Sequence, residues 1–192
     1  MGLNRFFASV FGAARPAAAE GLSAESIFRE HGRDVVRIVR RLVGPSAPDS
    51  DVDDLVQQVF MAVHKDLPRF RGDSAITTWL YGIASKTVLM HFRSGRRRAR
   101  AMEAFTEAKT AAPDRSGNPE AQALRAEEMR SVWRCLSEMS PKKRVVFVLA
   151  EVEGLSGREI AQALGIKEAT VWSRLFHARQ ELVEHLRKEQ HR

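Results

Sequence analysis

Apolar residues recur along this chain at helical spacing, and no stretch alternates apolar with polar positions as a half-buried strand does. The first periodic segment is expected to begin after Ser23, whose hydroxyl is a natural helix cap, and to end at Gly44-Pro45. Its inner positions are Ile27, Val35, Ile38, Val39 and Leu42. The pattern predicts an all-α protein.

Two further helices are expected within the first hundred residues. Ser50 is predicted to cap the first of them, and Pro68 is expected to stop it. The residues after that cap include three carboxylates, which interact favourably with the positive end of the helix dipole: Asp51, Asp53 and Asp54. The second helix follows a loop at 70–73 and has Ser74 as its predicted cap. Its inner stripe is Ile76, Trp79, Leu80, Ile83 and Thr87.

Helical periodicity is lost between about residue 101 and residue 120, where Ala, Pro, Gly and polar residues dominate. This composition is typical of a flexible linker. The chain is therefore expected to contain two small helical domains, at 23–100 and 123–192, joined by a linker at 101–122 and preceded by a flexible extension at 1–22.

A helix-turn-helix is predicted in the second domain. Ser156 and Glu159 form a capping-box sequence that opens a short helix, and Gly165 can end it in the left-handed conformation. A longer helix is expected from about Glu168, with an inner stripe of Val171, Leu175, Ala178 and Leu182. An ordinary αα-hairpin is the alternative interpretation.

The outer face of that longer helix carries side chains that suit base recognition. At about 100° per residue, it presents Ala169, Thr170, Ser173, His177 and Gln180, flanked by Arg174 and Phe176. Such groups can hydrogen-bond base edges or touch thymine methyls in the major groove. Nearby cations suit phosphate contacts, namely Lys142, Lys143, Arg144 and Arg158. Each of these residues, taken singly, fits a solvated surface position equally well.

Net charge supports a polyanionic partner. The chain carries +7 at pH 7, with a pI near 10.2. Residues 1–100 hold 16 Lys and Arg against 10 Asp and Glu, and much of this excess lies in one cluster: Arg93, Arg96, Arg97, Arg98 and Arg100. A solvated tail and a nucleic-acid contact both fit such a cluster.

Cysteine usage and hydropathy favour a cytoplasmic protein. Cys135 is the only cysteine and lies in an apolar helical stretch, so a buried core residue is expected rather than a nucleophile. No apolar run approaches the roughly 18 residues of a membrane span, so membrane insertion is not expected. The segment at 5–14 faintly resembles a signal peptide, but Arg15-Pro16 interrupts it, and a flexible extension is favoured.

No pattern of catalytic or metal-binding residues is present in the sequence. Histidines are scattered, at His64, His91, His177 and His185 among others, without the spacing of a metal site. We therefore expect no enzyme, no metal and no cofactor.

Three stretches resemble the extracytoplasmic-function (ECF, group IV) sigma factors of bacterial RNA polymerase. They are DVDDLVQQVF at 51–60, FRGDSAITTWLYGIA at 70–84, and the helix-turn-helix with GLS at 154–156 and TVWSRLFHAR at 170–179. The resemblance implies a sigma region 2 helical bundle followed by a sigma region 4 helix-turn-helix. It also implies binding to the clamp and flap of core RNA polymerase, recognition of promoter DNA as duplex and as single strand, and control by an anti-sigma factor.

The resemblance assigns three sets of site residues. Those expected at the −10 element, where rings and cations suit capture of an unpaired strand, are Phe70, Arg71, Asp73, Ser74, Thr78, Trp79, Lys86, Arg93, Arg96 and Arg97. Those expected at the −35 element are Arg158, Thr170, Ser173, Arg174, Phe176 and His177. Those expected to contact polymerase are Asp51, Asp54, Leu55, Gln57, Gln58 and Phe60. For Trp79 a pure core role is the alternative.

Three residues depart from what is common in that family. Lys86 stands where Asn is frequent, and Trp172 and His177 stand where Arg is common. An ammonium offers donors but no acceptor, so base preference at Lys86 is expected to differ. A transcriptional regulator that binds an operator without polymerase remains the alternative function.

Overall fold

The computed structural model describes residues 23–101 and 119–190 of the chain. Within these ranges every regular element is helical, which confirms the predicted all-α class. No described helix has the length and apolar content needed to span a bilayer. The predicted N-terminal extension and most of the predicted linker lie outside the described residues.

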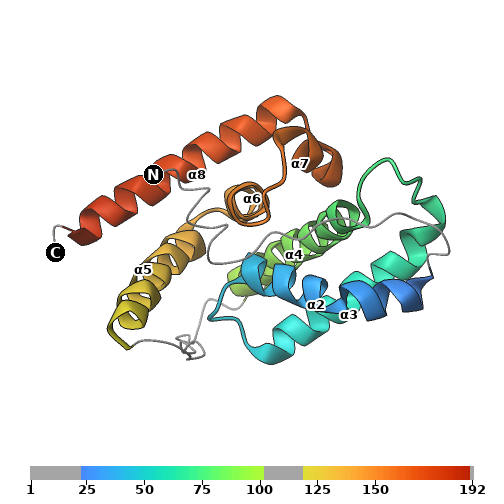
Figure 1. Ribbon diagram of the computed structural model, residues 1–192, viewed down its shortest axis with the longest axis horizontal. Helices are drawn as coiled ribbons and strands as arrows, with labels where there is room; N and C mark the ends of the chain where they lie inside the picture. Colours follow the sequence, from blue (N-terminus) through green and yellow to red (C-terminus); the bar gives the residue numbers. More distant parts are fainter. Residues whose placement is uncertain (1–22, 102–118, 191–192) are drawn as a thin grey trace.

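The first half of the described chain is a three-helix bundle. Its helices pack pairwise (Figure 1). They are α2 (Ala24–Val43), α3 (Asp49–Asp66) and α4 (Ile76–Ala101), with the short 3₁₀ helix η1 (Leu67–Arg69) after α3. The predicted apolar stripes explain the bundle, because Ile27, Val35, Ile38, Leu42, Leu55 and Leu80 are all fully buried.

Helix starts in this half follow the sequence in one case and depart from it in two. Ser23 caps α2, as predicted, and accepts a hydrogen bond from the Ser26 amide. The predicted cap at Ser50 is wrong, since α3 begins at Asp49 and Pro48 takes the cap position without a side-chain bond. Pro48 already has the extended backbone of a cap, and its carbonyl accepts from the next amides of the first turn. The predicted cap at Ser74 is wrong as well. Helix α4 begins at Ile76, so Ala75 and not Ser74 directly precedes it.

The second half contains five helical segments. They are α5 (Pro119–Glu138), α6 (Pro141–Phe147), the π-helix η2 (Val148–Val152), α7 (Gly157–Leu164) and α8 (Glu168–Gln190). The long α8 packs against α5, α6 and α7, and α6 lies between α8 and the first half (Figure 1). Cys135 is buried in this half, as predicted.

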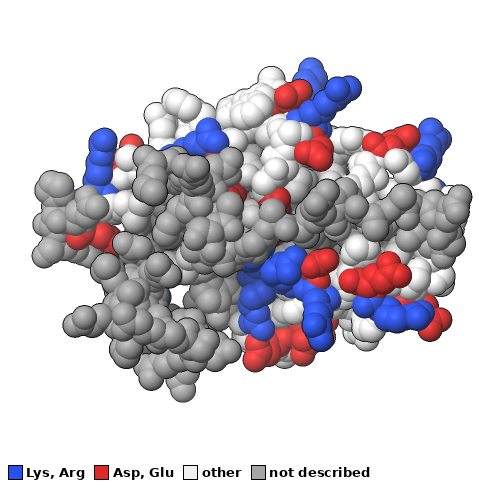
Figure 2. All heavy atoms as spheres, in the orientation of Figure 1, with Lys and Arg blue, Asp and Glu red and all other residues white. Residues whose placement is uncertain are grey.

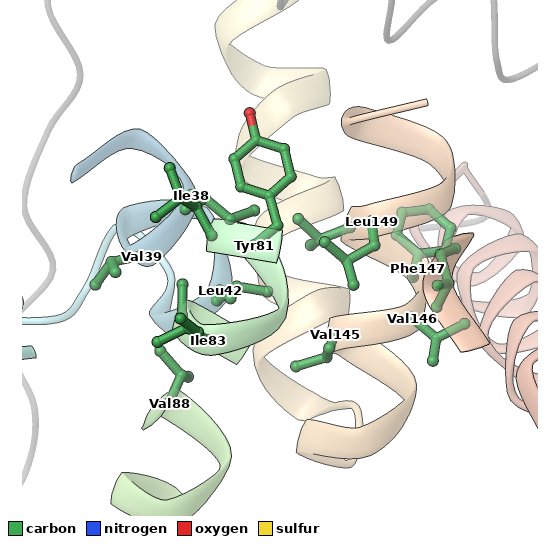
Figure 3. Close-up of a cluster of buried hydrophobic side chains, with 14 of the residues drawn as sticks. Ile38, Val39, Leu42, Tyr81, Ile83, Val88, Val145, Val146, Phe147 and Leu149 are labelled. Carbon is green, nitrogen blue, oxygen red and sulfur yellow. The ribbon is translucent and has the colours of Figure 1, made fainter. Parts of the chain in front are cut away.

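The two halves share one hydrophobic core rather than standing apart. Side chains of α2 and α4 lie beside those of α6 and η2 (Figure 3). The labelled members of this cluster include Leu42, Ile83, Val145, Phe147 and Leu149. Helix α4 also packs along α7, the first helix of the predicted helix-turn-helix. We call this contact between α2–α4 and α6–α7 the junction.

Candidate nucleic-acid interface

Local sequence sets the start and the end of α7. Ser156 accepts from the Glu159 amide, and the Glu159 carboxylate accepts from the Ser156 amide, so the predicted capping box is present. Gly165 ends the helix with φ +69°, the left-handed conformation that favours glycine. The α7–α8 turn is therefore determined by the residues that predicted it.

Helix α8 presents one buried face and one open face. Val171, Leu175, Ala178 and Leu182 are at most 3% exposed, as the inner stripe predicted. Of the expected −35 contacts, Ser173, Phe176, His177 and Arg158 are exposed, and Thr170 and Arg174 are half-buried. All six residues are therefore at least partly accessible on the α7–α8 unit.

An open groove runs beside this face. It has a volume of about 650 Å³ and is lined by Ala161, Gln162, Gly165, Ile166, Lys167, Thr170 and Arg174. Two of its residues are cationic and none is acidic, so the groove suits an anion such as a DNA phosphate.

Rings and cations gather where η1 leads into α4. The ring centroids of Phe70 and Trp79 lie 4.9 Å apart, and both side chains are half-buried, so each is partly core and partly surface. Arg71 and Asp73 are exposed in the same loop, and Ser74 is half-buried. This is a stacking surface beside charge, the combination that holds unpaired bases.

Helix α4 continues the positive charge away from that loop. Lys86 and Arg93 are exposed, and Arg96 and Arg97 lie in the last turns of the helix. On the face seen in Figure 2, however, basic and acidic side chains are interspersed over the coloured surface. A continuous basic surface is therefore not present on that part of the described molecule.

A mixed polar and apolar surface lies along α3. Gln57 and Gln58 are exposed, and Phe60 packs edge-to-face on Phe28, with ring centroids 4.8 Å apart. A groove of about 600 Å³ runs between α3 and α4 and is lined by Asp51, Asp54, Gln58, Met90, His91, Arg93 and Ser94. Five of the six residues expected to contact polymerase are therefore accessible or partly so.

Three expected contacts are corrected by burial. Leu55 is fully buried, because it shares the inner stripe of α3 with Val52 and Val59 and packs in the core. Thr78 is 5% exposed, on the side of α4 that faces away from solvent. Arg144 is also 5% exposed, so none of the three is presented to DNA or polymerase in this arrangement.

Arg144 serves the junction instead of a phosphate. Its guanidinium donates to the carbonyl of Val43 at 3.3 Å and to that of Ser137 at 2.7 Å, and it lies 5.1 Å from the centre of the Phe92 ring. Burial lowers the pKa of Arg144 from its ordinary value. Carbonyl acceptors and an aromatic face thus replace water around this cation.

The other polar contact of the junction is an ion pair. Arg41 of α2 and Glu153, just after η2, lie 2.5 Å apart, with side chains 8% and 6% exposed. Tyr81 adds hydrogen bonds with Arg37 and Glu153, and burial followed by the charge of Glu153 raises the pKa of Tyr81 to about 12. This cluster was not predicted from the sequence, although Arg41 directly precedes Leu42, a position of the predicted inner stripe.

The tightest approach at the junction involves backbone alone. A Cβ added at Gly82 of α4 would lie 2.7 Å from the carbonyl oxygen of Ala163 in α7. Real Cβ atoms do not approach so closely, so this crossing requires glycine for its lack of a side chain. Among the described residues, no group of three His, Cys, Asp or Glu side chains could hold a metal ion.

Comparison with known families identifies the two halves. The model for sigma-70 region 2 matches residues 27–98, and the model for sigma-70 region 4 matches residues 129–182. The chain is 36% identical over 147 residues to the ECF RNA polymerase sigma-E factor of Escherichia coli K12, covering 74% of this chain and 77% of that protein. It is 33% identical over 167 residues to the ECF RNA polymerase sigma factor SigE of Mycolicibacterium smegmatis, covering 86% and 62% of the two chains.

Solved structures agree on the fold. The sigma factor RpoE of Bartonella quintana, in complex with the anti-sigma factor NepR, matches with a TM-score of 0.63 at 22% identity, over 83% of this chain and 96% of that one. CnrH in complex with the cytosolic domain of CnrY matches with a TM-score of 0.55 at 23% identity, over 97% and 99%.

Proposed function

Because the chain belongs to the sigma-70 family, and within it to the ECF RNA polymerase sigma factors, we propose how its residues divide the work of promoter recognition. The protein binds core RNA polymerase, recognises −35 and −10 promoter elements and promotes strand opening. Helix α8 reads the −35 element as duplex DNA, and the aromatic-basic segment from Phe70 into α4 holds an unpaired −10 strand. Polymerase supplies the chemistry, and this chain carries out no reaction and needs no cofactor.

The observation that carries this division is the pairing of two unlike surfaces on one chain. The outer face of α8 offers short polar groups at Ser173 and His177, which suit base edges in the major groove. The Phe70–Trp79 pair offers ring faces, which suit bases that have left the stack. Duplex reading and strand capture therefore lie in different halves, within the proposed domains 123–192 and 23–100.

The groove between α3 and α4 is the proposed contact with the polymerase clamp. Asp54 and Gln58 line it and are exposed, Gln57 is exposed on the same helix, and the neighbouring Met61 is 69% exposed. Polar groups around a large exposed apolar side chain are typical of a protein interface. Leu55 supports this face from the core and is not part of it.

Promoter geometry favours an opening of the junction. The −35 and −10 elements lie about 25 base pairs apart, or about 85 Å along B-DNA at 3.4 Å per base pair. Helix α4 is 26 residues long, or about 39 Å, and it packs directly on α7, which supports α8. Because the length of α4 is less than half of that spacing, we infer that α4 and α7 separate when both elements are bound.

An anti-sigma factor is the proposed regulator of that opening. One solved structure with this fold is the sigma factor RpoE in complex with the anti-sigma factor NepR, and another is CnrH in complex with the cytosolic domain of CnrY. We infer that this chain is cytoplasmic and that an anti-sigma factor binds it there. In that complex the two halves stay in contact and cannot bind both promoter elements.

Transcription with purified core polymerase tests the proposed function. The chain should bind core and start specific transcripts from a library of genomic promoters, and Phe70→Ala should reduce open-complex formation while −35 duplex binding persists. Val36→Ala is the matched control, because that side chain is 43% exposed on α2, outside both the aromatic loop and the α3–α4 groove. Sequence-specific duplex binding without any binding to core would favour an operator-binding regulator instead.

A further inference from the structure

A large aromatic residue stands on the open side of α8. Trp172 is 51% exposed, although the residue beside it, Val171, is fully buried. Phe176 follows four residues later and is 57% exposed. At 100° per residue the two side chains lie about 40° apart around the helix axis, so they share one edge. An exposed pair of rings on a nucleic-acid face needs a physical explanation.

Trp172 is held in place by two contacts. A Cβ added at Gly157 would lie 2.7 Å from Cζ2 and 2.9 Å from Cε2 of the indole, so the ring rests on backbone that only glycine leaves open. The indole Nε1–H donates to the Glu168 carboxylate at 3.2 Å. Gly157 is buried without a positive φ, so glycine serves space and not backbone conformation here. Both contacts favour the orientation of the ring seen here.

The exposed part of this ring offers DNA an apolar surface and no free hydrogen-bond donor or acceptor. Indole has one hydrogen-bond donor and no acceptor, and that donor is already bonded to Glu168. The Glu168 carboxylate also places negative charge beside the ring, which disfavours a DNA phosphate at this point. The remaining partners on DNA are the base edges in the major groove. The apolar group among these edges is the 5-methyl group of thymine.

We infer that Trp172, fixed by Gly157 and Glu168, is a specificity-determining residue of the −35 reader and selects thymine through its 5-methyl group. Phe176 extends the same apolar edge. The inference rests on the proposed role of α8 in reading the −35 element, and the edge is continuous with the polar face at Ser173 and His177. Flanking cations at Arg158 and Lys167 favour DNA as the occupant of this surface.

Replacing thymine by uracil isolates the methyl group. Holoenzyme first selects its −35 element from a randomised duplex, and each thymine in the selected sequence is then changed singly to deoxyuridine, which pairs identically. We expect wild-type binding to weaken about threefold to tenfold at one or two positions, as the loss of one buried methyl group implies. Trp172→Ala should bind both bases equally at one of those positions, and Trp172→Phe should keep part of the discrimination.

Two variants separate positioning from folding. Gly157→Ala leaves Trp172 in the chain but displaces its ring, so it should also lose thymine discrimination. Val183→Ala removes an exposed apolar side chain farther along α8, 41% exposed, and should discriminate as wild type does. Circular dichroism of each variant shows whether the helices are retained, and Gly157→Ala supplies the answer if Trp172→Ala does not fold.

Three outcomes overturn the inference. They are a selected element without thymine, equal binding of thymine and uracil by the wild type, and unchanged discrimination in Trp172→Ala. In each of these the holoenzyme still selects a −35 element, so the proposed function survives. Failure to select any element would remove the proposed function together with the inference.

Discussion

Arg41 and Glu153 form a buried ion pair that joins helices more than a hundred residues apart in sequence. Neither side chain is more than 8% exposed, so both charges have left water and depend on each other and on their neighbours. Because this pair lies at the junction, its free energy contributes to the contact between the halves and not to either half alone.

Removal of the Glu153 charge should therefore open the molecule. Breaking a buried pair costs about 3–5 kcal/mol when the other charge stays buried, but Arg41 can regain water if the halves separate. We expect Glu153→Gln to increase the radius of gyration of the full chain in small-angle X-ray scattering, with little loss of helix. Asp49→Asn is the control, because its pair with Arg40 is exposed and lies within the first half. An unchanged radius in Glu153→Gln would show that the pair does not hold the junction.

Two glycines of α4 should respond oppositely to the same substitution. Gly95 has no atom within 4 Å of an added Cβ, so Gly95→Ala should stabilise the helix by about 0.5–1 kcal/mol. Gly82→Ala places its methyl 2.7 Å from the Ala163 carbonyl and should force α4 and α7 apart. The midpoint of thermal unfolding checks the stability of Gly95→Ala. The radius of gyration from small-angle X-ray scattering, together with binding to core polymerase, checks the separation of α4 and α7 in Gly82→Ala. A compact Gly82→Ala protein would contradict the backbone crossing.

Tyr81 provides a spectroscopic test of the same region at high pH. It is the only tyrosine, so the ultraviolet absorbance of tyrosinate reports it alone. Burial and Glu153 raise its pKa from 10.0 to about 12, which favours the protonated phenol in the folded protein. The resulting stability is fully present below pH 10 and is lost as the pH rises through about 12.

The titration should change in two ways when Tyr81 is perturbed. In denaturant the midpoint should return towards 10, and in Glu153→Gln it should fall below the wild-type value. Tyr81→Phe should flatten the decrease in unfolding free energy between pH 10 and 12, a difference on the order of 2 kcal/mol. A wild-type midpoint near 10 would mean that the phenol is open to water.

The two arginines predicted from sequence as phosphate contacts should differ in their effect on DNA binding. Arg158 is exposed at the start of α7, so Arg158→Ala should lower the slope of log K against log salt by about 0.9, the value for one released phosphate contact. Arg144 is buried, so Arg144→Leu should leave that slope unchanged and lower the free energy of unfolding. Titration of −35 duplex over a range of salt concentrations distinguishes the two results.

Apolar periodicity allowed most of the helices and the core positions to be predicted. The stripe of α8 and the capping box of α7 are local features, because each needs only neighbours three or four residues away. The junction could not be predicted in this way, since Gly82 and Ala163 meet through tertiary packing and the meeting leaves no periodic signal. The same packing placed Arg144 inside, where charge alone had suggested solvent.

Helix α7 is the element on which both halves depend. One side of it supports α8, and its C-terminal half meets α4 at Ala163. A compound or peptide that stabilised this contact between α4 and α7 would inhibit transcription without covering any residue proposed to contact DNA. The compound would bind backbone and a few small residues at the α4–α7 crossing. A bulkier residue there could exclude the compound and restore transcription, but it would also weaken the contact between α4 and α7 in the free protein.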